Sequence, residues 1–197
     1  MTQDFEAVTL FILELEKLKA VERRTKPLGL SRYENSAEHS WQIALLAVSL
    51  LPYSEHQLDA TKVITMLLLH DVVEIDTGDK FAYDANHDDY ENELAAAKRI
   101  FALLPQQQHQ LFLDLWIEFE QAQTPEAKFA KAIDRMMPVL QNLNNNCQSW
   151  LAHGISLMQV LDKNQAVAGA HPALWEWLKE QVLSRGQAAG VPLHSPD

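Results

Sequence analysis

Apolar residues recur at intervals of three and four along most of the chain, and this spacing is typical of amphipathic α-helices. No segment alternates apolar and polar residues over enough positions to indicate a half-buried strand. We therefore expect an all-α fold. The pattern predicts helices over residues 3–22, 36–51, 59–75, 91–104, 106–122 and 174–183, a further helix beginning at Pro125, and helical or irregular structure over 150–160. The first helix is expected to bury the side that carries Phe5, Val8, Ile12, Leu15 and Leu18.

Local signals mark several helix boundaries. Ser36 is a suitable N-cap, and Gly78 is a suitable stop for the helix before it. Thr124 followed by Pro125 is a strong helix start. Pro138 has no N–H to donate to the carbonyl one turn earlier, so the helix from Pro125 is expected to kink or restart there.

The length of 197 residues indicates one domain that spans the whole chain. The C-terminal tail from about residue 186 is expected to be flexible. The polar segment 80–90 follows a candidate site, so it is either a lid or a plain connection. The sequence leaves both interpretations open.

Composition narrows the classes of partner. The net charge of −11 repels nucleic-acid polymers, whereas a small phosphorylated ligand can bind where basic residues gather locally. Cys147 is the only cysteine, so no disulfide can form within the chain, which fits a reducing cytoplasm. Glu6, Glu14 and Glu16 interrupt the apolar residues at the start, so we expect no signal peptide. No apolar run approaches the ~18 residues that a membrane span requires.

The helix predicted over 59–75 changes at its end from an apolar run to a polar cluster. At about 100° per residue, His70, Asp71 and Glu74 share one side of the helix with apolar residues of the preceding turns. Burying an imidazole and two carboxylates is costly unless they are paired or bind a metal. The His-Asp dipeptide alone is weak evidence for a site. A second one, His87-Asp88, lies in a polar stretch that an exposed surface would explain equally well.

Two further residues from other helices point inward by the same reasoning. His39 shares a face with Ile43, although a lone histidine on such a face is more often a satisfied core residue. Asp134 shares a face with Ala130 and Met137, although a surface salt bridge is the alternative. Nitrogen and oxygen donors from several helices of a bundle can bind one divalent transition metal. The expected set is His39, His70, Asp71 and Asp134.

Other helical and nucleotide-binding motifs are absent. The chain contains no Glu-x-x-His of the di-iron bundles, no His-Glu-x-x-His, no P-loop and no Gly-x-Gly-x-x-Gly. A basic loop over residues 22–32 stands out in this acidic chain. It is either an anion clamp, since guanidinium groups suit phosphate oxygens, or an ordinary exposed loop.

The order of the candidate ligands resembles the HD-domain superfamily of metal-dependent phosphohydrolases. Three segments carry the likeness, namely ENSAEHSW at 34–41, LHDVVEIDTGD at 69–79 and AKAIDR at 130–135. They are similar to the branch that includes bacterial 5′-deoxynucleotidases. The resemblance implies an HD-domain helical bundle with one divalent transition metal (Co, Mn, Fe, Ni or Zn) between helices. It also implies a homodimer that hydrolyses (deoxy)nucleoside 5′-monophosphates to nucleoside and phosphate.

The resemblance also implies roles for individual residues. His39, His70, Asp71 and Asp134 would be the metal ligands. Glu74 would be the acid/base residue, Asp79 a second carboxylate lining the site, and Arg24 the phosphate contact. Thr25 stands where the nucleotidases have Trp, so the sugar preference stays open. Two alternatives also stay open: another phosphorylated nucleotide (a triphosphate, a cyclic dinucleotide or a guanosine polyphosphate), and a non-catalytic scaffold with a structural metal.

Overall fold

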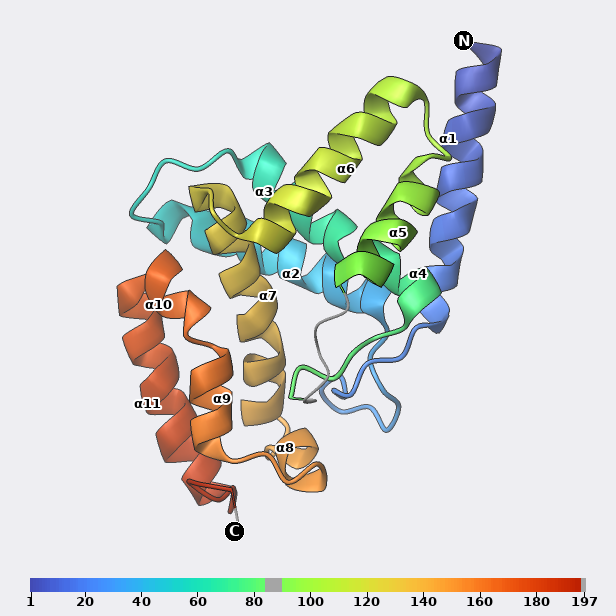
Figure 1. Cartoon of the computed structure of the whole chain (residues 1–197). Coiled ribbons are helices and arrows are strands. Elements are labelled where there is room, and N and C mark those ends of the chain that lie inside the picture. Colours follow the sequence, from blue (N-terminus) through green and yellow to red (C-terminus); the bar gives the residue numbers. More distant parts are fainter. Residues whose placement is uncertain (84–89, 196–197) are drawn as a thin grey trace.

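The computed structural model describes residues 1–83 and 90–195, and it is built from helices (Figure 1). No strand occurs in the described residues, and one isolated bridge joins Glu22 to Asn35. The all-α prediction is therefore confirmed. The elements in chain order are α1 (Thr2–Glu14), η1 (Leu15–Ala20), α2 (Ser36–Leu50), η2 (Leu51–Tyr53), α3 (Ala60–Leu69), η3 (His70–Val73), α4 (Glu74–Thr77), α5 (Tyr90–Phe101), α6 (Gln106–Gln121), α7 (Pro125–Leu143), α8 (Gln148–Ala152), α9 (Leu157–Lys163), α10 (Ala166–Ala170) and α11 (Pro172–Ala188).

Helices α2, α3 and α7 form the centre of the molecule, with α6 packed against α3 and α7. Their apolar sides share a core that includes Ile43, Leu67, Phe129 and Ile133. Helices α1 and α5 lie to one side, whereas α9, α10 and α11 lie beyond α7 on the other (Figure 1). Burial of these apolar stripes provides the main free energy that holds the helices in place. No helix in the described ranges is long and apolar enough to cross a membrane.

The helix expected over 59–75 is not continuous. Helix α3 ends at Leu69, the 3₁₀ turn η3 carries His70 and Asp71, and the short α4 ends at Gly78 with φ of 72°. Trp116 donates its indole N–H to the carbonyl oxygen of His70 at 3.1 Å. A tertiary contact, which the local pattern cannot reveal, therefore occupies a backbone acceptor in this turn.

Two details of the other long helices differ from the sequence predictions. The expected buried side of the first helix is wrong in part, because Phe5 and Ile12 are 70% and 54% exposed while Phe11 is buried. Of the kink or restart expected at Pro138, the restart is wrong, because α7 runs through Pro138 to Leu143, and the kink stays a prediction. Because Pro138 has no N–H, it donates no helical hydrogen bond to the carbonyl of Asp134. This gap lies at the turn from which the Asp134 side chain enters the site.

An extended backbone pairing links the segment after η1 to the start of α2. Arg23 donates its N–H to the carbonyl of Glu34 at 2.8 Å, and Glu34 donates to the carbonyl of Thr25 at 2.9 Å. Asn35 then caps α2 with a capping box that includes Glu38. The pairing holds Arg23 and Glu34 at the end of α2 that carries His39.

The segment after Gly186, expected to be flexible, packs against α9. Val191 is buried, and the carbonyls of Pro192 and Leu193 accept backbone hydrogen bonds from the first residues of α9. Of the segment expected to be a lid or a connection, residues 84–89 lie outside the described residues. The same holds for the His87–Asp88 pair.

Candidate metal centre

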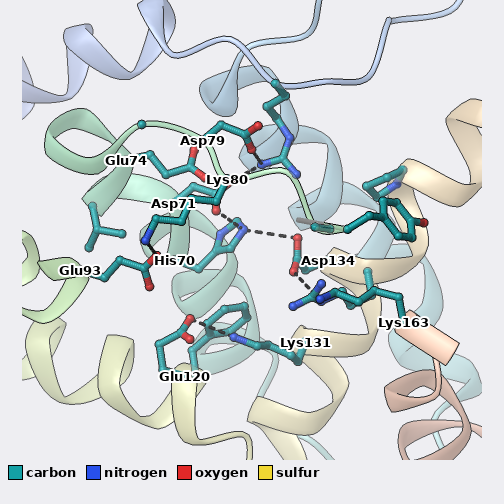
Figure 2. A pocket seen from close by; sticks show the side chains of 18 of the residues that line it. His70, Asp71, Glu74, Asp79, Lys80, Glu93, Glu120, Lys131, Asp134 and Lys163 are labelled. Atoms are coloured by element: carbon teal, nitrogen blue, oxygen red, sulfur yellow. Dashed lines mark hydrogen bonds and ion pairs between the residues drawn. The ribbon is translucent and has the colours of Figure 1, made fainter. Parts of the chain in front are cut away.

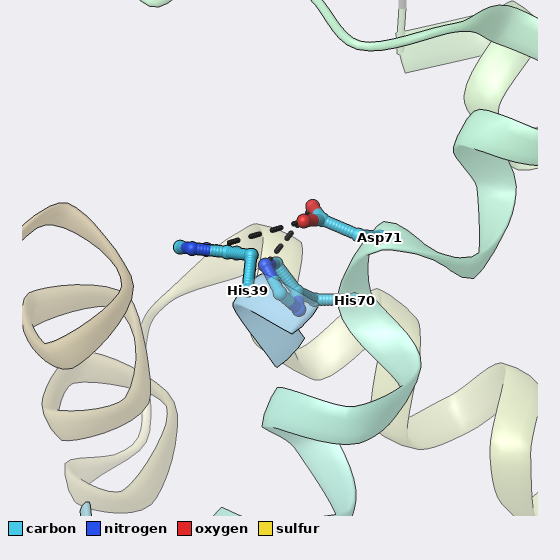
Figure 3. A group of neighbouring side chains, drawn as sticks. All are labelled: His39, His70 and Asp71. Carbon is cyan, nitrogen blue, oxygen red and sulfur yellow. Dashed lines mark ion pairs between the residues drawn. The ribbon is translucent and has the colours of Figure 1, made fainter. Parts of the chain in front are cut away.

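Four side chains from three elements converge at one point. His39 comes from α2, His70 and Asp71 from η3, and Asp134 from α7. Asp134 Oδ1 lies 3.0 Å from His39 Nε2 and 3.5 Å from His70 Nε2. Asp71 completes the group, with Oδ1 2.9 Å from His70 Nε2 and Oδ2 4.0 Å from His39 Nε2. Figure 3 shows the Asp71 carboxylate close to both imidazoles.

A backbone contact determines the tautomer of His70. Its Nδ1 lies 2.8 Å from the carbonyl oxygen of Leu67, which can only accept, so Nδ1 carries the proton. In the neutral ring Nε2 then presents a lone pair. Nε2 is buried and makes no hydrogen bond within the described part of the chain, although carboxylate oxygens lie within 3.5 Å. A lone pair among carboxylate oxygens is repulsive unless a proton or a metal ion lies between them.

The pKa values in the metal-free cluster also indicate that a cation is favoured there. Burial lowers the pKa of His70, but the carboxylates of Asp71 and Asp134 outweigh burial and raise this pKa to about 10. Burial acts to raise the pKa of Asp71, but His70 and Arg23 bring it down to about 2. Against burial, the histidines also hold the pKa of Asp134 well below its usual value. Without metal, a proton on an imidazole balances part of the negative charge.

The donor set fits a divalent transition metal. His39, His70 and Asp71 offer ligand atoms that all lie within 4.8 Å of one another, and Asp134 Oδ1 approaches both imidazoles. Two nitrogens and two carboxylates suit such ions, and four protein ligands leave positions for water and a substrate oxygen on an ion that prefers six. The donors do not distinguish among Mn, Fe, Co, Ni and Zn.

Glu34 lies behind the ligands and was not singled out from the sequence. Its carboxylate is 1% exposed, and Oε2 lies 3.7 Å from His39 Nδ1 and 3.6 Å from Arg23 Nε. It accepts hydrogen bonds from Thr25 at 3.2 Å and from Gln141 at 2.6 Å. A carboxylate on the far side of a ligating imidazole orients the ring. The sequence pointed to Glu34 only in that it begins segment 34–41, one of the three segments that carry the family resemblance.

Glu74 lines the cavity next to the four ligands. Ser36, fully buried at the start of α2, donates its hydroxyl to Glu74 Oε2 at 2.5 Å. Burial, followed by the negative charge of Asp71, raises the pKa of Glu74 well above the usual value for a carboxyl group. Burial also raises the pKa of Asp79, which lines the cavity as expected. Glu74 therefore keeps its proton to a higher pH than an ordinary glutamate does.

The basic loop contributes Arg23 to the cavity, whereas the family resemblance implied Arg24. Arg23 Nη1 lies 2.7 Å from Asp71 Oδ2 and 3.6 Å from Asp79 Oδ1. The Arg24 side chain is exposed and is not among the residues that line the cavity. Thr25 is buried against Glu34 and does not line the cavity either. In an extended segment successive side chains point to opposite sides, so a shift of one residue exchanges the inward and outward arginines.

The cavity has a volume of about 160 Å³ and opens beside the four ligands. Figure 2 shows Glu74 and Asp79 on one side of it, and Lys131 and Lys163 on the other. Four further basic residues line the cavity and were not predicted from the sequence. They are Lys80, Lys131, Arg135 and Lys163. Arg135 directly follows the candidate ligand Asp134 in the sequence. Lys163 belongs to α9 and reaches the cavity only because α9 packs near α7.

The HD domain family matches residues 15–175, which is most of the chain. The chain belongs to this family. The HD-domain bundle expected from the sequence is therefore confirmed. The solved structure of a predicted metal-dependent phosphohydrolase from Magnetospirillum magnetotacticum MS-1 is 38% identical, with a TM-score of 0.83 over 93% of this chain and 97% of that chain. The PH0347 protein of Pyrococcus horikoshii OT3, at 19% identity and a TM-score of 0.66, shares the fold.

Curated relatives of this HD domain carry the name 5′-deoxynucleotidase HDDC2. The protein of Xenopus laevis is 29% identical over 139 residues, which are 67% of this chain and 68% of the relative. The human protein is 28% identical over 115 residues, which are 57% of this chain and 55% of the relative. The chain thus matches about half to two thirds of the length of these relatives.

Proposed function

We propose that this HD-domain metal-dependent phosphohydrolase is a 5′-nucleotidase that hydrolyses (deoxy)nucleoside 5′-monophosphates to nucleoside and phosphate. The observation that carries the proposal is the convergence of two histidines and two aspartates beside a cavity, with Glu74 next to them. The names of the relatives from Xenopus laevis and human support the choice of substrate.

The four ligands would be His39, His70, Asp71 and Asp134. A divalent metal ion held there would polarise a phosphoryl oxygen and lower the pKa of a water molecule. Arg23 holds the oxygens of Asp71 and Asp79 in place, so that these carboxylates keep their positions when the cavity fills.

Glu74 is proposed as the proton donor. Because Ser36 donates to Oε2, Oε1 is the atom that can carry the proton. As a water oxygen bonds to phosphorus and the bond between phosphorus and the nucleoside oxygen breaks, this proton passes to the departing oxygen, which leaves as the neutral hydroxyl group of the nucleoside. The raised pKa of Glu74 keeps the carboxyl group protonated at a pH where an ordinary glutamate is ionised.

Release of inorganic phosphate from a panel of nucleotides tests the proposal. The panel contains ribo- and deoxynucleoside monophosphates, nucleoside triphosphates, a cyclic dinucleotide and guanosine polyphosphates. With bound Co²⁺ or Mn²⁺ verified by elemental analysis, we expect phosphate from the monophosphates and none from their 3′-isomers. Metal-loaded protein that hydrolyses no monophosphate would contradict the proposal, and release of pyrophosphate or triphosphate would identify another reaction.

A homodimer and a cytoplasmic location are also proposed. The resemblance to the nucleotidases supports the dimer, and the lone buried Cys147 fits a reducing compartment. Light scattering after size-exclusion chromatography tests the dimer, since a monomer mass at micromolar concentration would contradict it. Fractionation of the source cells tests the location.

A further inference from the structure

Five basic side chains line the cavity, and most of them already have acidic partners. Arg23 contacts Asp71 at 2.7 Å and has Glu34 and Asp79 within 3.6 Å. Its positive charge is thus matched by three carboxylates. Burial acts to lower the pKa of Arg23, but the negative charges of Asp71, Glu74, Asp79 and Asp134 outweigh burial and raise it above the usual value. A guanidinium group held in this way has little capacity left for a phosphate.

Lys80 and Lys131 are also paired. Lys80 lies 2.9 Å from Glu93 Oε1, and Lys131 lies 2.9 Å from Glu120 Oε1. The Lys131 ammonium also lies over the ring of Phe119, 4.2 Å from its centre. These two cations therefore contribute to the structure of the cavity wall.

Arg135 and Lys163 differ from the other three. The nearest carboxylate oxygen to Arg135 is Asp134 Oδ2 at 3.9 Å, and the other oxygen of Asp134 lies against the two histidines. Lys163 makes no ion pair in the described residues. Burial, followed by the positive charge of Arg135, lowers the pKa of Lys163. Both side chains line the same cavity, Arg135 has only the distant Asp134 Oδ2 as an acidic partner, and Lys163 has none among the described residues, an arrangement that an anion would stabilise.

We propose that Arg135 and Lys163 bind the phosphate group of the substrate, and that Arg23 serves to position Asp71 and Asp79. This inference rests on the proposed function, since it concerns the same cavity. The position of Arg135 supports this proposal. Its guanidinium group lies next to Asp134, and so close to the place where the phosphate would meet a metal held by the four ligands. Lys163, the last residue of α9, lines the same cavity and would approach the same phosphate. Together they supply positive charge to the phosphate as its bond to the nucleoside breaks.

Lys163→Gln is the sharpest test, because Lys163 contacts none of the four ligands. We expect roughly tenfold weaker binding of inorganic phosphate by isothermal titration calorimetry with the full chain, with and without Mn²⁺, since one charge-assisted hydrogen bond is lost. The KM for a nucleoside monophosphate should rise by a similar factor, and Lys163→Arg should restore most of the loss. Arg135→Lys should weaken phosphate binding less than Arg135→Gln does.

Lys131→Gln is the matched control, because it removes an equal charge from the same cavity, but one paired with Glu120. We expect its phosphate affinity to stay within about twofold of the original protein, a difference of a few tenths of a kcal/mol. Lys163→Gln should not lower the melting temperature, because it removes a partly desolvated charge that faces Arg135. Equal losses of phosphate affinity in Lys131→Gln and Lys163→Gln would overturn the inference, as would unchanged phosphate affinity in Lys163→Gln.

The results separate this inference from the proposed function. If no nucleotide is hydrolysed but phosphate affinity falls in Lys163→Gln and not in Lys131→Gln, the anion site stands and the nucleotidase proposal fails. If monophosphates are hydrolysed and Lys163→Gln changes neither KM nor phosphate affinity, the nucleotidase proposal stands and the anion site fails.

Discussion

Gln141 of α7 donates a 2.6 Å hydrogen bond to Glu34, a carboxylate that lies before α2 and far away in the sequence. The contact is fully buried and connects two helices that each provide a metal ligand. Through Glu34 it reaches His39 Nδ1 and Arg23 Nε, neither of which has a hydrogen-bond partner of its own. Glu34 therefore places a negative charge beside both a candidate ligand from α2 and the arginine that contacts Asp71.

Replacing Glu34 by Gln should destabilise the protein and weaken metal binding. The substitution keeps the shape but removes a charge that faces Arg23, so we expect a loss of about 1–3 kcal/mol in the free energy of unfolding. Urea denaturation of the metal-free protein measures the loss, and titration with Co²⁺ measures the affinity. Glu55→Gln, at an exposed site, is the control and should change neither. An equally stable Glu34→Gln protein with unchanged Co²⁺ affinity would contradict the assignment.

His70→Asn should abolish stoichiometric metal binding while the helices persist. Its Nε2 is the buried donor without a hydrogen bond, and the loss of one donor of four lowers affinity strongly. Elemental analysis of the purified protein gives the metal content, and circular dichroism checks the fold. His56→Asn removes an exposed histidine and should leave the metal content unchanged. Full metal content in His70→Asn would show that the cluster is not the site.

Trp116→Phe should weaken metal binding without touching a ligand. The indole N–H donates a buried hydrogen bond to the His70 carbonyl at the start of η3, and phenylalanine cannot make this bond. We expect a loss of about 1–3 kcal/mol in the free energy of unfolding, together with lower Co²⁺ affinity. Trp177→Phe, at a half-exposed position on α11, provides the comparison. If both variants bind Co²⁺ equally well, the indole contact has no part in shaping η3.

Glu74→Gln should change how stability depends on pH. The folded pKa of Glu74 lies above its unfolded value, so the folded protein holds this proton more tightly and loses that advantage as the pH rises through the folded pKa. In EDTA, Glu74→Gln should therefore be more stable than the original protein at pH 8, by about 1.4 kcal/mol for each unit by which the pKa is raised. Below pH 4 the difference should disappear. A constant difference across the range would show that the carboxyl group titrates normally.

The same substitution should remove most of the hydrolysis of nucleoside monophosphates while metal stays bound. A loss of about 10²–10⁴-fold in kcat is the usual effect of removing a general acid. Full activity of Glu74→Gln would assign the proton transfer to another group, with Asp79 the nearest candidate in the cavity wall.

The all-helical class and the four candidate metal donors could be predicted from the sequence alone, because both depend on local residue patterns. Apolar spacing of three to four specifies helices, and the inward faces of those helices carried His39, His70 and Asp134. The same patterns failed where a tertiary contact competes with local preference. The continuous helix through His70 is interrupted at η3, where the His70 carbonyl accepts a hydrogen bond from Trp116, and α7 continues through Pro138.

The choice between neighbouring arginines was decided only by the tertiary structure. Arg23 and Arg24 are chemically identical, and their inward or outward direction depends on the backbone pairing with Glu34, which is a contact between distant residues. Lys163 became a cavity residue for the same kind of reason, because the packing of α9 near α7 places it beside Arg135. Helical periodicity reports which face of a segment is buried, whereas the partner of that face is set by long-range packing. The sequence therefore specified the candidate metal ligands, and the fold specified the charges around the cavity.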